Sequence, residues 1–508
     1  MSRDDPSSQP NPVVTLAAGR ILGTSENGIN CFLGVPYAAP PFGALRFAPP
    51  APVPAWEGTR DATRKGPVAP QAVPTAEEME ALLPGLDIEP LVGDGMFQGD
   101  DCLSANIWAP ARGEAHPVFV FIHGGAFTGG CGSADVYDGT AFAAAGVVCV
   151  TINYRLGIEG FLPIPGAPTN LGLRDQISAL KWVRDNIAAF GGDPDNVTVS
   201  GESAGAMSVA NLVVSPLAGG LFRRAVAQSG HGSMVRPVEV AQRLVGKIAG
   251  ILGVTPDLEG FQSASVADCL AALKRVSEPK AKVRLRNDDG REPAFGLSRF
   301  LPVYGDDVLP QHPLNALAEG MGDGIDLLIG TNREEMNLYF VPSGLHRKIG
   351  RILSYVAVRM SEPRAWAILK AYGLLRRGRR PGAVFTEAMT DLVFCLPARR
   401  FALAHQGRTH FYEFGWRSSA CGGELGACHA MELPFVFDTL HTAAGARGLA
   451  GEDPPQALAE HMNGLWAEYC RSGQLPWPEY DASSRLVYAP EKGEAARDRD
   501  IPADGLLP

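Results

Sequence analysis

The chain has 508 residues, of which 45% are hydrophobic and 20% charged, which is typical of a soluble globular protein. Its net charge of −10 excludes the basic footprint of a nucleic-acid-binding protein. No apolar run reaches the ~18 residues of a membrane-spanning helix, and the N-terminus lacks the apolar segment of a secretory signal. Nine cysteines without a CxxC pair predict reduced thiols in a cytoplasmic protein, with neither a disulfide framework nor a metal site.

The N-terminal part of the chain is predicted to be irregular. We expect residues 1–13 to form a flexible tail and residues 14–40 to form short strands. The proline-dense stretch PPFGALRFAPPAPVPAW, residues 40–56, is typical of an ordered loop. Residues 72–99 mix acidic and apolar side chains with Gly and Pro. They are predicted to form a surface loop over a site.

The central part of the chain alternates apolar strands with helices. Strands are predicted in NIWAP, PVFVFIHGG, VVCVTINYR, NVTVS, RRAVAQSG and DLLIGTN. Between them, LRDQISALKWVRDNIAAFGG repeats apolar residues at helical spacing and ends at a glycine pair. Such alternation predicts an α/β fold with a mostly parallel sheet covered on both faces.

Two predominantly helical segments, residues 237–290 and 344–406, are predicted to be cap insertions into one catalytic unit that spans residues 14–490. Residues 491–508 are expected to form a C-terminal tail. The second insertion places many arginines on apolar helices. A membrane-surface helix is one interpretation, but the overall acidity favours a cap with a solvated basic face and no stable membrane association.

The stretch VTVSGESAGA, residues 197–206, matches the G-x-S-x-G nucleophile elbow at a strand-to-helix corner. A β-carbon at Gly201 or Gly205 would obstruct the sharp turn, and Ser203 would adopt strained backbone angles with its hydroxyl exposed. The alternative is a glycine-rich turn with a solvated serine. The β-branched strand before the motif and the helix-forming run after it favour a catalytic serine.

Order along the chain restricts the partners of Ser203, because this elbow is followed first by an acid and then by a histidine. His429 lies in a loop, GACHAMELPFVF, and is favoured as the base because mobile loops supply such groups. On order alone, the rivals are His405, His410, His441 and His461. The acid is expected where the strand DLLIG ends, and spacing does not separate Glu334 from Glu335.

A serine that attacks a carbonyl group also needs backbone donors for the negative charge that develops on the carbonyl oxygen. FVFIHGGAFTGG follows an apolar strand and matches an HGGG-type loop. We therefore predict an oxyanion hole formed by Gly124, Gly125 and the amide of Ala204. His123 precedes the serine and is expected to anchor this loop.

Several longer stretches together carry a family resemblance. They span roughly residues 14–480 and include FLGVPYAAPPFGALRF, DDCLSANIWAP, INYRLGIEGFL, AVAQSG, GTNREE and GACHAMELPFVF, besides the elbow and the glycine loop. With them the chain resembles the type-B carboxylesterases, the group that includes cholinesterases and bacterial para-nitrobenzyl esterases. The resemblance implies an α/β-hydrolase fold and a Ser-His-Glu triad.

The resemblance assigns further roles. It implies that Glu335 is the catalytic acid, although Met336 stands where the family usually has glycine. It implies a buried network behind the triad, formed by Glu202, Ser229 and Glu432. It also implies two structural ion pairs, Arg46 with Asp100 and Arg155 with Asp175.

The cysteines depart from the animal members of the family. Those members close a loop with a disulfide that ends at the position of Cys102, but the expected partner region here reads GPVAPQ. This predicts that no disulfide closes the 72–99 loop, as in a bacterial-type intracellular enzyme. Cys428, next to His429, is interpreted as a packing residue.

The resulting hypothesis is a serine carboxylesterase that hydrolyses small-molecule esters without a metal or cofactor, preferring short to medium acyl chains and bulky alcohols. The alternatives are an amide or carbamate hydrolase with the same triad and a non-catalytic binding member of the fold. Oligomeric state cannot be predicted from the sequence. The candidate pocket walls are Phe127, Phe161, Met207, Met336, Leu338 and Phe340.

Overall fold

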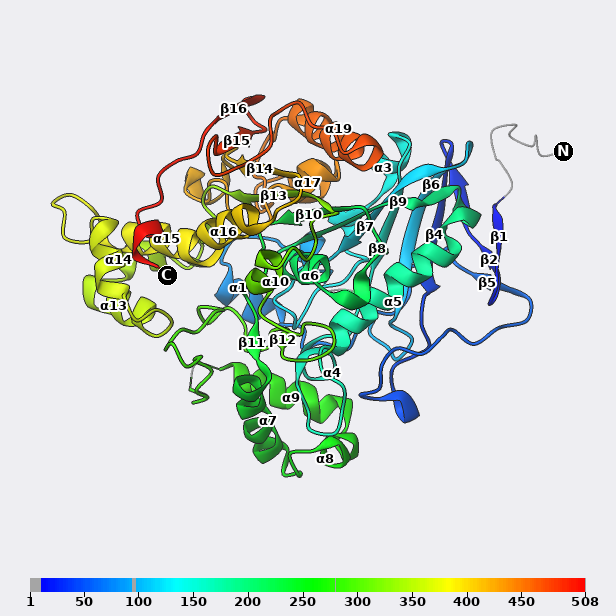
Figure 1. Ribbon diagram of the computed structural model, residues 1–508, viewed down its shortest axis with the longest axis horizontal. Coiled ribbons are helices and arrows are strands. Elements are labelled where there is room, and N and C mark those ends of the chain that lie inside the picture. Colours follow the sequence, from blue (N-terminus) through cyan, green and yellow to red (C-terminus); the bar gives the residue numbers. More distant parts are fainter. Residues whose placement is uncertain (1–10, 94–96, 279, 508) are drawn as a thin grey trace.

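In the computed structural model, which describes residues 11–93, 97–278 and 280–507, an eleven-stranded sheet runs through the centre of the molecule (Figure 1). From one edge to the other, its strands are β16 (Glu494–Arg497), β15 (Leu486–Ala489), β14 (Thr409–Phe414), β13 (Asp326–Asn332), β10 (Arg224–Gln228), β9 (Gly192–Glu202), β7 (His116–Ile122), β8 (Val148–Ile152), β6 (Ser104–Pro110), β4 (Ile29–Pro36) and β3 (Thr24–Glu26).

The middle of this sheet is parallel, as the alternating sequence predicts. Strands β8, β7, β9, β10, β13, β14 and β15 pair in parallel, and the antiparallel pairs lie at the two edges. The carboxyl ends of parallel strands meet at one edge of the strand layer, where ligands bind in open α/β sheets. Ser203 follows β9 at this edge, and Glu335 follows β13.

Helices cover both faces of the sheet because the parallel strands are apolar on both sides. In β7, Val118, Val120 and Ile122 belong to one hydrophobic core, whereas Phe119 and Phe121 belong to the other. The first core includes α5 (Leu171–Asn186) and α6 (Ala204–Val213). The second includes α3 (Thr140–Ala144), α17 (Leu433–Val436) and α19 (Gln456–Ser472), on the opposite side in Figure 1.

Both predicted insertions are helical. The first contains α7 (Val238–Leu252), α8 (Leu258–Ser263) and α9 (Val266–Ser277). The second contains α12 (Leu345–Lys348), α13 (Arg351–Arg359), α14 (Ala365–Ala371) and α15 (Pro381–Thr390), followed by a π-helical turn (Asp391–Cys395) and α16 (Leu396–Ala404). Figure 1 shows α7–α9 at the bottom and α13 and α14 at the left end, away from the sheet.

Further short elements include α4 (Gly157–Phe161), α10 (Pro313–Ala318), α11 (Asn337–Phe340), α18 (Leu440–Ala443) and the two-stranded pair of β11 (Arg236–Pro237) with β12 (Val303–Tyr304).

The segment 72–99, expected as a loop, forms two short helices over its described residues. They are α1 (Ala76–Leu82) and α2 (Glu89–Val92), and residues 94–96 lie outside the described part. A capping box starts α1, because Thr75 accepts from the amide of Glu78 while Glu78 accepts from the amide of Thr75. The Gly and Pro residues of this segment favour a loop, but the capping box of Thr75 and Glu78 starts a helix.

The expected C-terminal tail needs correction, whereas most of the expected N-terminal tail, residues 1–13, lies outside the described residues. Residues 1–10 lie outside the described part of the chain, but Val13 begins β1 (Val13–Leu16), which pairs with β2 (Gly19–Leu22) in a small sheet with β5 (Thr59–Asp61). Residues 491–508 are not a tail: β16 closes one edge of the main sheet, and Arg499 pairs with Asp391 and Glu413. Charge pairing with residues far away in the sequence fixes this end.

Candidate active site

Ser203 lies at the corner between β9 and α6. Its backbone angles, φ 56° and ψ −122°, are unusual for a residue with a side chain and mark a strained turn. The two glycines permit that turn: a β-carbon on Gly205 would lie 1.9 Å from the carbonyl oxygen of Ile122, and one on Gly201 would lie 2.4 Å from the carbonyl carbon of Gly205. The corner therefore holds the serine hydroxyl away from the helix that follows.

His429 precedes α17 in a loop and lies between a hydroxyl and a carboxylate. Its Nε2 is 2.8 Å from Ser203 Oγ, and its Nδ1 is 2.7 Å from Glu335 Oε2. The backbone amide of His429 also donates to the carbonyl oxygen of Glu335 at 3.1 Å. With Nδ1–H directed at the carboxylate, Nε2 is free to accept the proton of the serine.

Glu335 is held by the turn that follows β13. Its Oε1 accepts from the backbone amide of Asn332 at 2.7 Å, and the side chain is fully buried. Met336, which replaces the glycine usual in the resembled family, has ordinary right-handed angles (φ −75°, ψ −1°) and donates its amide to Thr390. The turn is therefore compatible with a side chain at this position.

Glu334, the other acid considered, points elsewhere. It forms an ion pair with Arg417 and accepts from the amide of Ala427 at 3.0 Å. It fastens the chain that leads to His429 and takes no part in the Ser203–His429–Glu335 row of hydrogen bonds.

Two further buried carboxyl groups lie behind the row. Glu202 Oε1 is 3.1 Å from His429 Nε2, and Glu432 accepts from the side-chain amides of Asn332 and Gln228. Burial, helped by Glu432 and Glu335 and opposed by His429, raises the pKa of Glu202 to about 8. Burial and the charge of Glu335 raise the pKa of Glu432 to about 7.

The carboxylates of Glu202 and Glu335 shift the pKa of the His429 imidazole in the direction opposite to that caused by burial. Burial alone lowers the pKa of His429, but Glu202 and Glu335 outweigh it and hold this pKa above its usual value. Their negative charge stabilises the imidazolium that forms when His429 takes a proton. Ser229, the third residue of the expected network, is buried at a positive φ of 53°, and its hydroxyl has no hydrogen-bond partner among the described residues.

The glycine loop after β7 passes next to the serine. A β-carbon on Gly124 would lie 3.0 Å from Ser203 Cβ, and one on Gly125, at φ 106°, would lie 2.1 Å from the carbonyl oxygen of Gly129. The amide of Ala204 starts α6, a position whose N–H has no acceptor within its own helix. The loop and the helix start thus both border the serine: Gly124 and Gly125 line one cavity with Ser203, and Ala204 lines another with it.

His123 fixes this loop from the inside. Its Nδ1 donates to the carbonyl oxygen of Gly124 at 2.8 Å, and its ring stacks on Tyr154 with 4.4 Å between centroids. Burial lowers the pKa of His123 to about 4, which keeps the ring neutral. These contacts match its expected role as an anchor.

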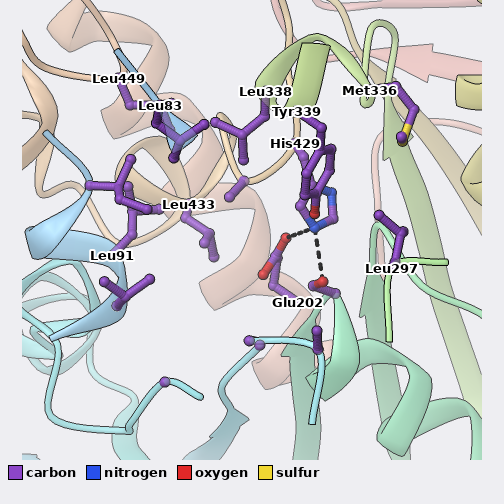
Figure 2. Close-up of a pocket in the computed structure, with 18 of the residues that line it drawn as sticks. Leu83, Leu91, Glu202, Leu297, Met336, Leu338, Tyr339, His429, Leu433 and Leu449 are labelled. Atoms are coloured by element: carbon purple, nitrogen blue, oxygen red, sulfur yellow. Dashed lines mark hydrogen bonds and ion pairs between the residues drawn. The ribbon is translucent and has the colours of Figure 1, made fainter. Parts of the chain in front are cut away.

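A cavity of about 530 Å³ opens beside Ser203 and His429. Figure 2 shows Leu83, Leu91, Leu433 and Leu449 gathered on one side of Glu202 and His429, with Leu297 and Met336 on the other. Leu83 and Leu91 come from the 72–99 segment, so this segment forms a wall of the site as predicted. A substrate part that enters this cavity meets almost only hydrocarbon.

A second, smaller cavity of about 50 Å³ lies on the other side of the serine. It touches Ser203 and Ala204 but not His429, and its walls include Phe127, Met207, Met234 and Phe394. The two cavities meet at Ser203 and share Leu297 and Tyr339. The serine thus stands between a large and a small apolar space.

Five of the six candidate pocket walls line these cavities. Met336, Leu338 and Phe340 line the large one, and Phe127 and Met207 line the small one. Phe161 is buried behind Phe127, with 4.7 Å between ring centroids, and supports the wall from outside.

The rival histidines lie away from the serine. His405 contacts Thr409, His410 lies in β14 against Trp477, and His461 lies in α19 next to the hydroxyl of Tyr488. His441, in α18, lines a different cavity near α3. Each of them belongs to the packing of another region.

One of the two expected ion pairs is wrong. Arg155 pairs with Asp175 at 2.7 Å in full burial, as expected. Arg46 pairs instead with Glu159 of α4 at 2.6 Å, and Asp100 is exposed. No local sequence pattern predicts that Asp100 faces solvent while Glu159 of α4 lies next to Arg46, because this depends on how distant segments pack.

Three residues next to the Ser203–His429–Glu335 row of hydrogen bonds were not predicted from the sequence. Asn332 joins Glu335 and Glu432, and its place three residues before Glu335 in GTNREE could have suggested it. Phe394 lies against the His429 ring at 4.6 Å, presented by the π-helical turn, and Tyr339 approaches the same ring at 5.8 Å. No local pattern predicts a π-helical turn at this place.

Three further observations concern possible metal ligands, membrane-spanning helices and the cysteines. Among the described residues, no group of three or more His, Cys, Asp or Glu side chains is placed to hold a metal ion. Over the same residues, no helix has the length and apolar character needed to cross a membrane. All nine cysteines, Cys102 and Cys428 included, are free thiols.

Fold, hydrogen-bonded row and glycine loop are those of an α/β-hydrolase, and residues 10–489 match the Carboxylesterase family, so the chain belongs to that family. It is 37% identical to the para-nitrobenzyl esterase of Bacillus subtilis (strain 168) over 93% of each chain, and 34% identical to the phenmedipham hydrolase of Pseudarthrobacter oxydans over 96% of this chain and 97% of that one.

Solved structures agree with this assignment. A para-nitrobenzyl esterase superimposes with a TM-score of 0.81 at 34% identity, covering 98% of this chain and 100% of the other. A Geobacillus stearothermophilus carboxylesterase superimposes with a TM-score of 0.79 at 35% identity, covering 96% and 98%. The protein is a serine hydrolase of carboxylic esters.

Proposed function

We propose that Ser203, His429 and Glu335 are the catalytic triad, and the observation that carries this proposal is their continuous row of hydrogen bonds beside an apolar cavity. His429 Nε2 takes the proton of Ser203 as its oxygen attacks the ester carbonyl carbon. Glu335 fixes the imidazole tautomer and stabilises its charged form. The new oxyanion accepts hydrogen bonds from the amides of Gly124, Gly125 and Ala204.

The intermediate collapses when the bond between the carbonyl carbon and the alcohol oxygen breaks. His429 returns its proton to that oxygen, and the alcohol leaves. A water molecule then gives a proton to His429 and attacks the acyl carbon, and the proton returns to Ser203 Oγ as the carboxylic acid departs. These steps need no metal or cofactor.

The two cavities support a preference for short acyl chains and bulky apolar alcohols. The alcohol must face His429 because it receives the proton from Nε2, and His429 lines the cavity of about 530 Å³. The acyl chain then faces the cavity of about 50 Å³, on the side that lacks His429. A short acyl group fits there, and each further methylene presses against packed aromatic and methionine side chains.

The test combines labelling with a substrate series. A fluorophosphonate probe is expected to label Ser203, and Ser203→Ala is expected to lose both labelling and turnover of para-nitrophenyl acetate, butyrate and octanoate. Turnover should fall from butyrate to octanoate. Equal labelling of Ser203→Ala would contradict the assignment of the nucleophile, and an octanoate maximum would contradict the acyl preference. Faster turnover of an anilide or carbamate with the same acyl group would favour the amide or carbamate alternative.

We further propose that the protein acts in the cytoplasm. Its nine free cysteines, seven of them buried, suit a reducing compartment. Fractionation of the source cells with an antibody against the chain tests this location, and recovery in an extracellular fraction would contradict it.

A further inference from the structure

The arginine-rich insertion carries an unusual concentration of exposed apolar side chains. Of the twelve large hydrophobic side chains that are exposed among the described residues, seven lie in residues 345–375. Figure 1 shows α13 and α14 of this insertion at one end of the molecule. The seven are Leu345, Ile352, Leu353, Val356, Met360, Trp366 and Leu375, and we call them the apolar patch.

Three members of the apolar patch on α13, together with Met360 at the C-terminal cap of this helix, form one stripe. Ile352, Leu353, Val356 and Met360 follow each other at positions i, i+1, i+4 and i+8, which fall on one side of an α-helix. Ile352 is 79% exposed and Met360 63%. The opposite side of the helix, with Ser354 and Val358, is buried against the protein.

The stripe continues onto α14 through aromatic packing. Trp366 contacts Tyr355 of α13 edge to face, with ring centroids 6.0 Å apart, and remains 51% exposed. Exposed contiguous apolar surface of this kind marks an interaction site. Tryptophan at its margin is typical of side chains that settle at a lipid headgroup boundary.

Basic side chains surround the apolar patch. Residues 345–380 contain ten Lys or Arg side chains and one acidic side chain, Glu362, in a protein whose net charge is −10. Two of the ten, Arg347 and Arg379, pair with glutamates. Within the described residues, no carboxylate lies at ion-pair distance from Arg351, Lys370, Arg376, Arg377 or Arg380.

We propose that this face of α13 and α14 docks onto an anionic lipid surface. Apolar side chains enter the headgroup boundary while the surrounding cations contact lipid phosphates, the arrangement found in interfacial helices. A second copy of the chain is a poorer occupant, because a symmetric contact would place two sets of uncompensated cations opposite each other. The solvated basic cap expected from the sequence accounts for the arginines but not for the exposed stripe.

The apolar patch is joined along the chain to one wall of the large cavity. Leu345 follows α11 by five residues, and Leu338 and Phe340 of α11 line that cavity. The proposal is independent of the proposed triad, because none of the patch residues lines either cavity at Ser203.

The test is cosedimentation of the full chain with two kinds of vesicles, phosphatidylcholine alone and an equal mixture of phosphatidylcholine and phosphatidylglycerol. We expect binding to the mixed vesicles, weak binding to the neutral ones, and release by added salt. The double variants Ile352→Ser/Leu353→Ser and Arg376→Gln/Arg377→Gln should each weaken binding at least about tenfold.

Matched controls make the same changes elsewhere on the surface. Val13→Ser/Leu217→Ser removes exposed apolar side chains, and Arg20→Gln/Arg112→Gln removes exposed cations. Both should bind vesicles like the unsubstituted chain, and all four variants should retain turnover of a soluble ester, which separates this result from the proposed function. Absent binding, equal binding to neutral vesicles or equal loss in the controls would overturn the proposal. So would a concentration-dependent dimer that Ile352→Ser/Leu353→Ser dissolves.

Discussion

Three features of individual residues meet at Ser203: a strained backbone conformation, buried carboxylates next to His429 and two apolar cavities. The serine occupies a positive-φ corner, His429 is flanked by Glu335 and Glu202, and two cavities of unequal volume meet at the hydroxyl. Of these features, the carboxyl of Glu202 acts on the proton-accepting nitrogen of His429. It touches the same nitrogen that must accept the proton of the serine.

Glu202→Gln is expected to shift the pH dependence of kcat/KM. His429 must be neutral to accept a proton, so activity is lost as pH falls through its pKa. Glu202 raises that pKa, and removing its charge therefore lowers the pKa and moves the acid limb to lower pH. Glu432→Gln, the same change farther from Nε2, should give a smaller shift. An unmoved acid limb in Glu202→Gln would show that this carboxyl does not act on His429.

Met234→Ala is expected to change acyl preference. The substitution removes volume from the wall of the small cavity, so the ratio of octanoate to acetate turnover should rise by about tenfold, the effect of one or two accommodated methylenes. Leu449→Ala enlarges the large cavity instead and should leave that ratio unchanged while altering preference among alcohols. Equal acyl profiles for Met234→Ala and the unsubstituted enzyme would contradict the assignment of the small cavity to the acyl chain.

At the scale of elements, the strand–corner–helix unit of β9 and α6 depends on close backbone contact. Helix α6 starts so near β7 that a β-carbon on Gly205 would overlap main-chain atoms of Ile122 and His123. Main-chain atoms cannot rotate away as a flexible side chain can. The packing of α6 onto the sheet is thus coupled to the position of Ser203.

Gly205→Ala is expected to destabilise the protein. The new β-carbon would lie 1.9 Å from the carbonyl oxygen of Ile122, and relief of that clash must move α6 or β7 at a cost of about 3 kcal/mol or more. Gly246→Ala provides the matched control, because nothing lies within 4 Å of its β-carbon in α7 and alanine favours a helix by about 0.5–1 kcal/mol. Thermal unfolding should show opposite shifts in Tm, and a stability unchanged in Gly205→Ala would contradict the close contact.

At the scale of the whole molecule, the C-terminal segment closes the fold through charge. Glu413 of β14 contacts Arg333, Arg399 and Arg499, and Arg499 also reaches the buried Asp391 of the π-helical turn. Burial raises the pKa of Glu413, but the arginines outweigh it and lower this pKa to about 2. The network thus joins the sheet edge, the second insertion and the last residues of the chain.

Arg499→Met is expected to lower the free energy of unfolding by about 2–4 kcal/mol, because it leaves Asp391 buried without its cation. The value is below that of a fully buried pair because Arg499 is one-third exposed. Arg497→Met removes an exposed arginine two residues away and should change stability by less than about 0.5 kcal/mol. Denaturant unfolding measures both, and equal effects would contradict a structural role for the network.

The sequence by itself determined the order of strands and helices, the elbow at Ser203 and the family, because these depend on periodicity and on residues adjacent in the chain. The order of motifs along the chain favoured His429 as the catalytic base. Spacing did not distinguish Glu334 from Glu335 as the acid, and only the family resemblance favoured Glu335. Only the tertiary structure decided the pairing of Arg46 with Glu159, the attachment of residues 491–508 and the unequal cavities. Those features depend on which segments meet after folding, and burial and charge pairing across hundreds of residues leave no local pattern to read.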